Sequence, residues 1–305
     1  MRKPDDSCLW PEQYAKVRKE AERLLVEAGA LGRFPTPVAE IMEAAKVEEV
    51  QEDVLNESFL AKMRRKAGDR LKRALSKVIG LFDAGARLVL IDRTIHIVKQ
   101  TFVRLHETAH GFMAWQRKMY SVVEDCEKTL DPEIADQFDR EANVFASEVL
   151  FQLDRFNRDA EEMKFGILTP VNLSKKYGGS IYASVRRYVI GNWRACAVLV
   201  LNPPELVDGN GFRVSLRRVV VSPSFNNLYG ELNWPDYFTP DDRIGAMVPL
   251  RGRRMSNKRE IILQDRNGDE LLCIAEAFTQ KYQVFVLILP VKALTAKSVL
   301  MTATI

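Results

Sequence analysis

Two of the chain's three histidines stand four residues apart in the stretch HETAH, residues 106–110. Positions i and i+4 of an α-helix lie on one face, so His106 and His110 could bind the same metal ion. Glu107 is turned about 100° away on such a helix, close enough to exchange a proton with water at that ion. The pattern predicts a zinc site with Glu107 as its acid/base. The alternative is a helix with two packed histidines.

A catalytic zinc site needs a third protein ligand. Residues 130–151, LDPEIADQFDREANVFASEVLF, predict a helix that Asp131 caps and Pro132 begins. Glu141 and Glu148 both lie on its apolar stripe, where a carboxylate needs a metal or a paired cation. Position alone does not choose between these two carboxylates. The stripe recurs at helical spacing and consists of Phe138, Ala142, Phe145 and Val149.

The stretches HETAH and REANVFASEVLF together resemble the ImmA/IrrE family of metallopeptidases, whose pattern is H-E-x-x-H and later E-A-x-x-F-A. The resemblance implies that His106 and His110 are zinc ligands. It also implies that Glu107 is the catalytic acid/base and that Glu141 is the third ligand. Zn²⁺ is therefore the expected cofactor.

The resemblance covers roughly residues 35 to 190, well over half of the chain. Family members usually carry a bulky residue and then Gly inside the zinc motif, where this chain has Thr108 and Ala109. Neither difference removes a ligand. The resemblance implies a zinc-dependent endopeptidase of the cytoplasm that cuts a helix-turn-helix transcriptional repressor and so releases the genes that it silences.

Other elements are expected to position the zinc motif. Residues 77–92, KVIGLFDAGARLVLID, alternate around a DAGA turn and predict a β-hairpin, whose edge could hold a peptide beside His106. Residues 11–28 and 36–45 are expected to form helices. Residues 61–77 carry eight basic residues against one acid. Such a run is typical of a solvated helix face, and it could also dock an acidic partner.

The predicted fold class is α+β in three parts. A zincin-like metallopeptidase domain is expected over residues 1–165, a helix-turn-helix-like helical segment over 166–205, and a β-rich α/β C-terminal domain over 206–305. The last part could be a sensor, a scaffold or a dimerisation domain. Its expected strands are GAMVPLRG (245–252), REIILQDRNGDELLCIAEAF (259–278, folded at an Asn-Gly turn) and YQVFVLILPV (282–291).

The middle segment predicts two short helices around a tight turn. Thr169 and Pro170 begin the first helix, Gly178 and Gly179 end it, and Ser180 caps the second. Six basic residues and no acidic one lie from Lys164 to Arg194, which suggests weak contact with DNA phosphates. The other interpretation is a helical hairpin that packs against the peptidase domain.

Composition is consistent with a soluble intracellular protein. The hydrophobic fraction of 47% is ample for packed cores, and no apolar run approaches the length of a membrane span. The N-terminal residues MRKPDDSCLW show no apolar signal region. The four scattered cysteines form no C-x-x-C pair, so reduced thiols are expected. A cytoplasmic protein without a membrane partner is the prediction.

A rival hypothesis comes from another functional class. It takes the protein to be a DNA-binding transcription regulator with a structural zinc site. Closed structural sites usually have four protein ligands, whereas this sequence offers three obvious ones, which favours the enzyme.

Overall fold

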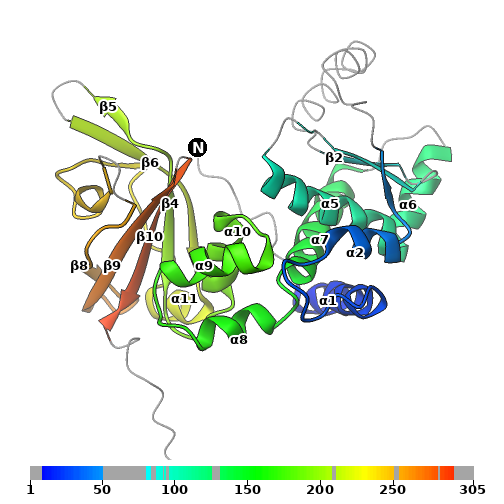
Figure 1. Ribbon diagram of the computed structural model, residues 1–305. Helices are drawn as coiled ribbons and strands as arrows, with labels where there is room; N and C mark the ends of the chain where they lie inside the picture. The colour runs from blue at the N-terminus through cyan, green and yellow to red at the C-terminus, as the bar shows by residue number, and fades with distance from the viewer. Residues whose placement is uncertain are drawn as a thin grey trace, which may run out of the picture. The chain divides into compact units, whose positions relative to one another are not determined.

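The protein is a mixed α+β protein whose described residues divide into two compact units (Figure 1). Residues 9–158 and 173–183 form the first, here termed the histidine unit, and residues 159–172 and 184–291 form the second, the sheet unit. The structure is a computed structural model, and it describes residues 9–50, 80–83, 87–91, 93, 96–125, 131–207, 211–250, 254–280 and 282–291. The basic run at residues 61–77 lies outside these ranges.

The histidine unit combines a helical layer with a small sheet. Its strands lie in the order β1-β3-β2, with β1 parallel and β2 antiparallel to β3. The pairing of β2 with β3 confirms the predicted hairpin, and both predicted N-terminal helices are present. The elements are α1 (Pro11–Glu27), α2 (Val38–Ala44), β1 (Glu48–Glu49), β2 (Gly80–Asp83), β3 (Leu88–Ile91), α5 (Ile97–Phe112), α6 (Ala114–Asp125) and α7 (Pro132–Leu150).

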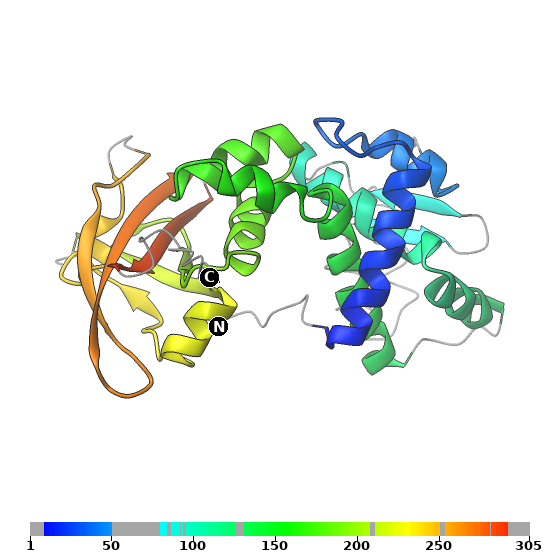
Figure 2. The ribbon, with the colours of Figure 1, turned by 90° about the horizontal axis from the view of Figure 1, so that it is seen from below.

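Helix α7 is the centre of the histidine unit, because α1 and α5 both pack against it (Figure 2). Asp131 caps this helix by accepting a hydrogen bond from the backbone N–H of Glu133, and Pro132 occupies its first turn, as predicted. The four apolar stripe residues of α7 are all buried. Leu105 of α5 and Leu24 of α1 are also fully buried. This packing fixes which face of α5 meets α7.

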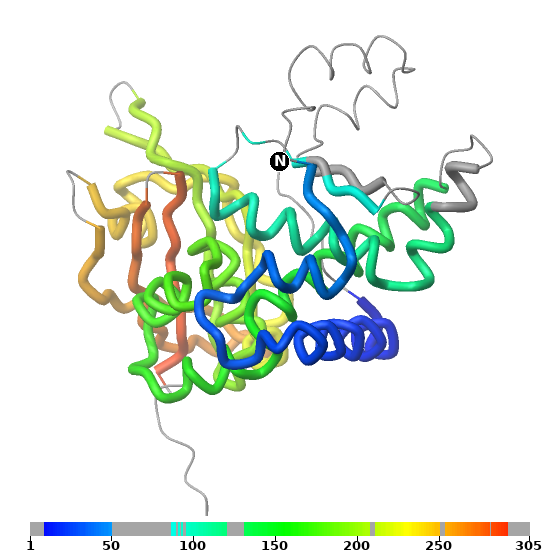
Figure 3. Tube along the Cα trace, turned by 45° about the vertical axis from the view of Figure 1, so that its right-hand side comes forward, coloured from blue at the N-terminus to red at the C-terminus, as the bar shows by residue number. Residues whose placement is uncertain are grey.

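The sheet unit is built on an antiparallel sheet in the order β5-β6-β4-β10-β9-β8, with β7 paired to β6 (Figure 3). Every residue of β4 and β10 is buried, so these strands form its core. The elements after α7 are α8 (Arg155–Glu161), α9 (Leu168–Tyr177), α10 (Ile181–Ile190), β4 (Ala197–Leu201), β5 (Glu205–Val207), β6 (Gly211–Val221), α11 (Pro223–Tyr229), β7 (Tyr237–Phe238), the 3-10 helix η1 (Gly245–Met247), β8 (Arg259–Gln264), β9 (Glu270–Gln280) and β10 (Gln283–Pro290).

The strands agree with the sequence prediction in part. The β8–β9 hairpin and β10 lie where they were expected. The sheet begins at Ala197, however, earlier than residue 206. The strand predicted at residues 245–252 is wrong over residues 245–250, because the chain forms η1 there and residues 248–250 form no strand; residues 251–252 lie outside the described ranges. A β-carbon at Gly245 would lie 1.8 Å from the Thr239 carbonyl oxygen, so the chain turns tightly, and Met247 and Val248 enter the core from that turn.

The helical pair α9 and α10 matches the prediction closely. Gly178 follows α9 with a positive φ of 74°, which glycine adopts without steric cost. The Ser180 hydroxyl accepts a hydrogen bond from the backbone N–H of Ala183, at 3.1 Å, and so caps α10. Among the described residues, no helix is long and apolar enough to cross a membrane.

Candidate metal centre

Helix α5 presents both histidines of the HETAH motif on one face, as predicted. The third histidine, His96, precedes the helix and accepts a hydrogen bond from the backbone N–H of Val98, at 3.3 Å, so it acts as a cap. The His106 and His110 rings meet edge to face, with centroids 4.9 Å apart. Their Nε2 atoms are 3.3 Å apart. The two rings therefore aim at one point.

Asp139 of α7 completes a three-atom group with these histidines. Its Oδ1 lies 3.9 Å from the Nε2 atom of His106 and 3.9 Å from that of His110. A point equidistant from the three atoms would be about 2.2 Å from each, close to the Zn–N and Zn–O bond lengths of about 2.0–2.2 Å. The group could hold a metal ion.

Hydrogen bonds to the other ring nitrogens support this interpretation. Asn143 Oδ1 lies 3.1 Å from Nδ1 of His106, and Gln116 Oε1 lies 2.6 Å from Nδ1 of His110. If each oxygen accepts a hydrogen bond from Nδ1–H, both Nε2 atoms carry lone pairs that face one another across 3.3 Å. Two facing lone pairs repel, and a cation between them would relieve that repulsion. The residues therefore fit a metal ion.

Burial sets the charge of His110. Loss of solvent and the neighbouring His106 lower the pKa of His110 to about 3, so His110 is neutral at physiological pH. Metal ligation requires this neutral form. Partial desolvation and the charge of Asp136 raise the pKa of Asp139, although its side chain is 64% exposed and water therefore screens the effect.

Glu107 lies beside this group and is almost completely buried, with 8% of its surface exposed. Burial, and to a smaller extent the charge of Asp139, raise the pKa of Glu107 to about 8 in the metal-free protein. Tyr120 of α6 is half-buried, and its ring centroid is 5.3 Å from that of His110. Burial and the charges of Asp139 and Glu107 raise the pKa of Tyr120 well above its ordinary value, so its hydroxyl keeps its proton.

Glu141, the third ligand expected from the sequence, is not part of the three-atom group. Its Oε2 accepts hydrogen bonds from Trp115 Nε1 and Gln116 Nε2, both at 2.7 Å. Glu148, the competing carboxylate, accepts a hydrogen bond from the Tyr14 hydroxyl at 2.6 Å and lies 3.7 Å from Arg18. An arginine partner thus explains Glu148. The geometry favours Asp139 as the third ligand.

Sequence reasoning missed Asp139, Asn143, Gln116 and Tyr120. Asp139 and Asn143 are one helical turn apart, so they form a polar pair on the face of α7 that meets α5. That spacing could have been noticed beside the apolar stripe. Gln116 and Tyr120 are also one turn apart, on α6, but no pattern connected that helix with the histidines.

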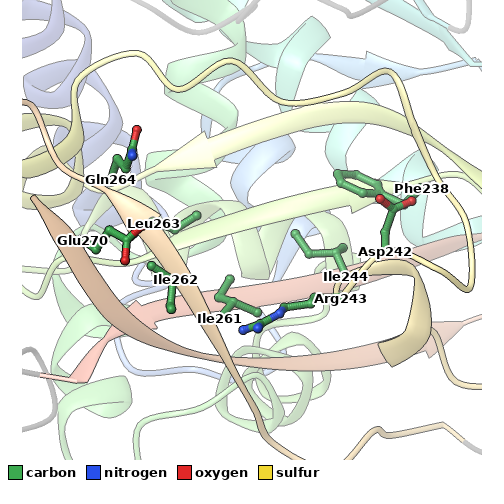
Figure 4. A pocket seen from close by; sticks show the side chains of 9 residues that line it. All are labelled: Phe238, Asp242, Arg243, Ile244, Ile261, Ile262, Leu263, Gln264 and Glu270. Carbon is green, nitrogen blue, oxygen red and sulfur yellow. The ribbon is translucent and has the colours of Figure 1, made fainter. Parts of the chain in front are cut away.

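The sheet unit contains a cavity of about 450 Å³ between β8 and the segment before η1 (Figure 4). Ile244 and Ile261, both buried, are among the residues that line it. The figure shows Glu270 at one end of the cavity and Asp242 at the other. Asp242 Oδ2 already accepts hydrogen bonds from the backbone N–H and the hydroxyl of Thr239, at 2.7 and 3.2 Å. The two carboxylates of the cavity therefore do not converge on one point.

No family model matches the chain, and no curated protein matches it. Among solved structures, the chain is similar to one described as a Mycobacterium tuberculosis transcriptional regulator. The two share 15% sequence identity at a TM-score of 0.51, over 95% of this chain and 93% of that chain. At this low identity the likeness concerns the fold alone.

Proposed function

We propose that the protein is a zinc-dependent endopeptidase that cleaves a helix-turn-helix transcriptional repressor. One observation carries the proposal: two imidazole Nε2 atoms and a carboxylate oxygen surround one point, and the helix of the two histidines also carries the buried Glu107. A donor set of two nitrogens and one oxygen suits zinc, and three protein ligands leave a position open for substrate or water. His106, His110 and Asp139 would hold the ion. The ion would supply Lewis-acid polarisation of the scissile carbonyl.

Glu107 has the environment of a general base. Its carboxyl group is buried and lies on α5 next to His106, so it would adjoin a water molecule held by the ion. We assign it the transfer of a proton from the attacking water to the amine of the departing peptide. We assign the role of hydrogen-bond donor to Tyr120, because its ring packs against His110 and its hydroxyl keeps its proton.

The repressor substrate follows from the resemblance to the ImmA/IrrE metallopeptidases. An intracellular peptidase that cut any exposed strand would be toxic, so we expect poor activity on casein-like substrates. The test incubates the wild type and Glu107→Gln with helix-turn-helix proteins encoded near the gene for this chain, and intact mass locates any cut. We expect one zinc-dependent cleavage, slower by about 10²–10⁴-fold in the variant, which keeps its metal ligands.

Two outcomes would contradict this proposal. Equal cleavage by the wild type and Glu107→Gln would remove Glu107 from the chemistry. Free degradation of unrelated unfolded proteins, with no repressor cut under any metal or stress condition, would leave a general peptidase in place of a regulator.

The second candidate function is DNA-binding transcription regulation, which the name of the solved structural neighbour favours. Lys175 and Lys176 are exposed at the end of α9, and Arg186 is half-exposed on α10. Basic side chains of the segment also contact aromatic rings: Lys176 Nζ lies 4.5 Å from the Phe34 ring centroid, and the Arg194 guanidinium lies 5.1 Å from the Phe165 ring centroid. This favours weak phosphate contact over sequence-specific reading.

A further inference from the structure

A buried amide fixes the orientation of one histidine of the metal centre. Gln116 is fully buried, and its Nε2 donates to the Phe138 carbonyl oxygen at 3.2 Å and to Glu141 Oε2 at 2.7 Å. Both partners accept hydrogen bonds, so rotating the amide by 180° would turn its oxygen towards two other oxygens. The Gln116 oxygen must therefore face His110 Nδ1, 2.6 Å away.

This orientation selects one tautomer of His110. An amide oxygen can only accept, so Nδ1 must carry the proton. His110 Nε2 is then unprotonated and directed at the point shared with His106 and Asp139. The metal-binding tautomer is thus set before any metal arrives.

Glu141 anchors the amide. Its carboxylate is 4% exposed and receives three N–H donors: Trp115 Nε1 at 2.7 Å, Gln116 Nε2 at 2.7 Å and Gln137 Nε2 at 3.1 Å. Lys16 Nζ of α1 lies 3.7 Å from the Trp115 ring centroid, which places a positive charge behind that donor. The negative charge of Glu141 polarises the Gln116 amide and thereby strengthens the acceptor that His110 meets.

We propose that Glu141 is a positioning residue, which acts through Gln116 to hold His110 in the Nδ1–H tautomer and to make its Nε2 a stronger metal donor. The inference rests on the proposed function in one respect, the binding of zinc at Nε2. The tautomer itself is a property of the metal-free protein. Glu141 therefore has a role that differs from direct ligation. Loss of Glu141 would weaken zinc binding in either case, so the experiment must separate the two roles.

Glu148 offers a matched control for Glu141. Both are buried carboxylates on α7, seven residues apart, with exposed fractions of 1% and 4%. Glu148 is paired with Tyr14 and Arg18, and none of its hydrogen bonds described here leads to a histidine. A glutamine at either position removes one buried charge from the same helix, so a general loss of stability should affect the two variants alike.

The experiment compares the full-length wild type, Glu141→Gln, Glu148→Gln and the exchange Gln116→Glu/Glu141→Gln. Zinc affinity is measured by competition with a chromophoric chelator, and the tautomer of His110 by long-range ¹H–¹⁵N NMR of the metal-free protein. We expect Glu141→Gln to weaken zinc binding by about 10–100-fold and to reduce the Nδ1–H population, and Glu148→Gln to do neither. The exchange gives up the hydrogen bond to the Phe138 carbonyl oxygen but places a carboxylate directly at Nδ1, so it should restore the Nδ1–H population and most of the zinc affinity.

Each remaining result counts against one specific claim. If Glu141→Gln abolishes zinc binding and the exchange does not restore it, Glu141 is a direct ligand and the positioning role is wrong. If Glu141→Gln and Glu148→Gln changed zinc affinity and the His110 tautomer equally, Glu141 would contribute only to the stability of the fold. If the wild type takes up no zinc, the proposed function fails, while the NMR spectrum still decides whether Glu141 sets the tautomer.

Discussion

The candidate metal centre of the histidine unit and the cavity of the sheet unit differ in how their polar groups are arranged. In the candidate metal centre, two Nε2 atoms from α5 and one carboxylate oxygen from α7 lie within 3.9 Å of one another. Gln116 of α6 holds one of the histidines. In the cavity of about 450 Å³, Asp242 and Glu270 lie at opposite ends, and Asp242 is engaged by Thr239.

This difference shows why volume alone is a poor guide to function. Chemistry requires several groups directed at one reacting atom, each held by its own partners. The histidines meet that requirement through Asn143 and Gln116. The cavity has space and walls of mixed polarity, but Asp242 and Glu270 lie at its opposite ends. Function is therefore expected from the metal centre.

The largest expected effect is the loss of metal when a ligand is removed. The wild type should bind about one zinc per chain, and His110→Ala or Asp139→Asn should weaken binding by roughly a thousand-fold or more. Asp242→Asn in the sheet-unit cavity is the control and should bind zinc like the wild type. Metal analysis after dialysis measures this. If Asp139→Asn kept its zinc and Asp242→Asn lost it, the zinc would bind in the sheet-unit cavity and not at the histidines.

A smaller effect is expected on the stability of the metal-free protein. Glu107 has a pKa of about 8 when folded, above its ordinary value of 4.5, so its neutral form contributes stability that is lost as pH rises between these values. Burial lowers the pKa of His110, so its contribution makes stability rise with pH, mainly below its ordinary pKa of 6.5. From pH 6.5 to 8, urea unfolding should show a decline of about 2 kcal/mol.

Glu107→Gln supplies the control for this decline, because a glutamine does not titrate. The slope between pH 6.5 and 8 should largely disappear in the variant. An unchanged slope would mean that the buried carboxyl group of Glu107 is not the group that titrates, and that its environment differs from the one described.

The smallest expected effect concerns DNA and the exposed lysines of α9. Binding of duplex DNA should be weak at physiological salt, and Lys175→Ala combined with Lys176→Ala should reduce the slope of log affinity against log salt by about 1–2. Filter binding across salt concentrations measures the slope. A nanomolar, sequence-specific complex would instead favour the transcription regulator.

How much of this could be predicted from sequence depends on the range of the interactions. The cap at Asp131 and the burial of Glu141 were predicted because both follow from helical spacing within one segment. The choice of Asp139 depends on how α7 is rotated against α5, a long-range packing property. The role of Gln116 depends on contacts with two other helices. Met247 and Val248 enter the core from a turn, which the apolar run alone did not indicate.

X-ray absorption at the zinc edge would show whether His106, His110 and Asp139 form an open metal site. We expect two imidazole rings and two oxygen donors around zinc, one from Asp139 and one from solvent, at about 2.0–2.2 Å. In Asp139→Asn, any residual signal should keep both imidazoles. Sulfur scatterers, a third imidazole from His96 or four protein ligands would contradict this expectation, because a closed structural site would then replace a catalytic one.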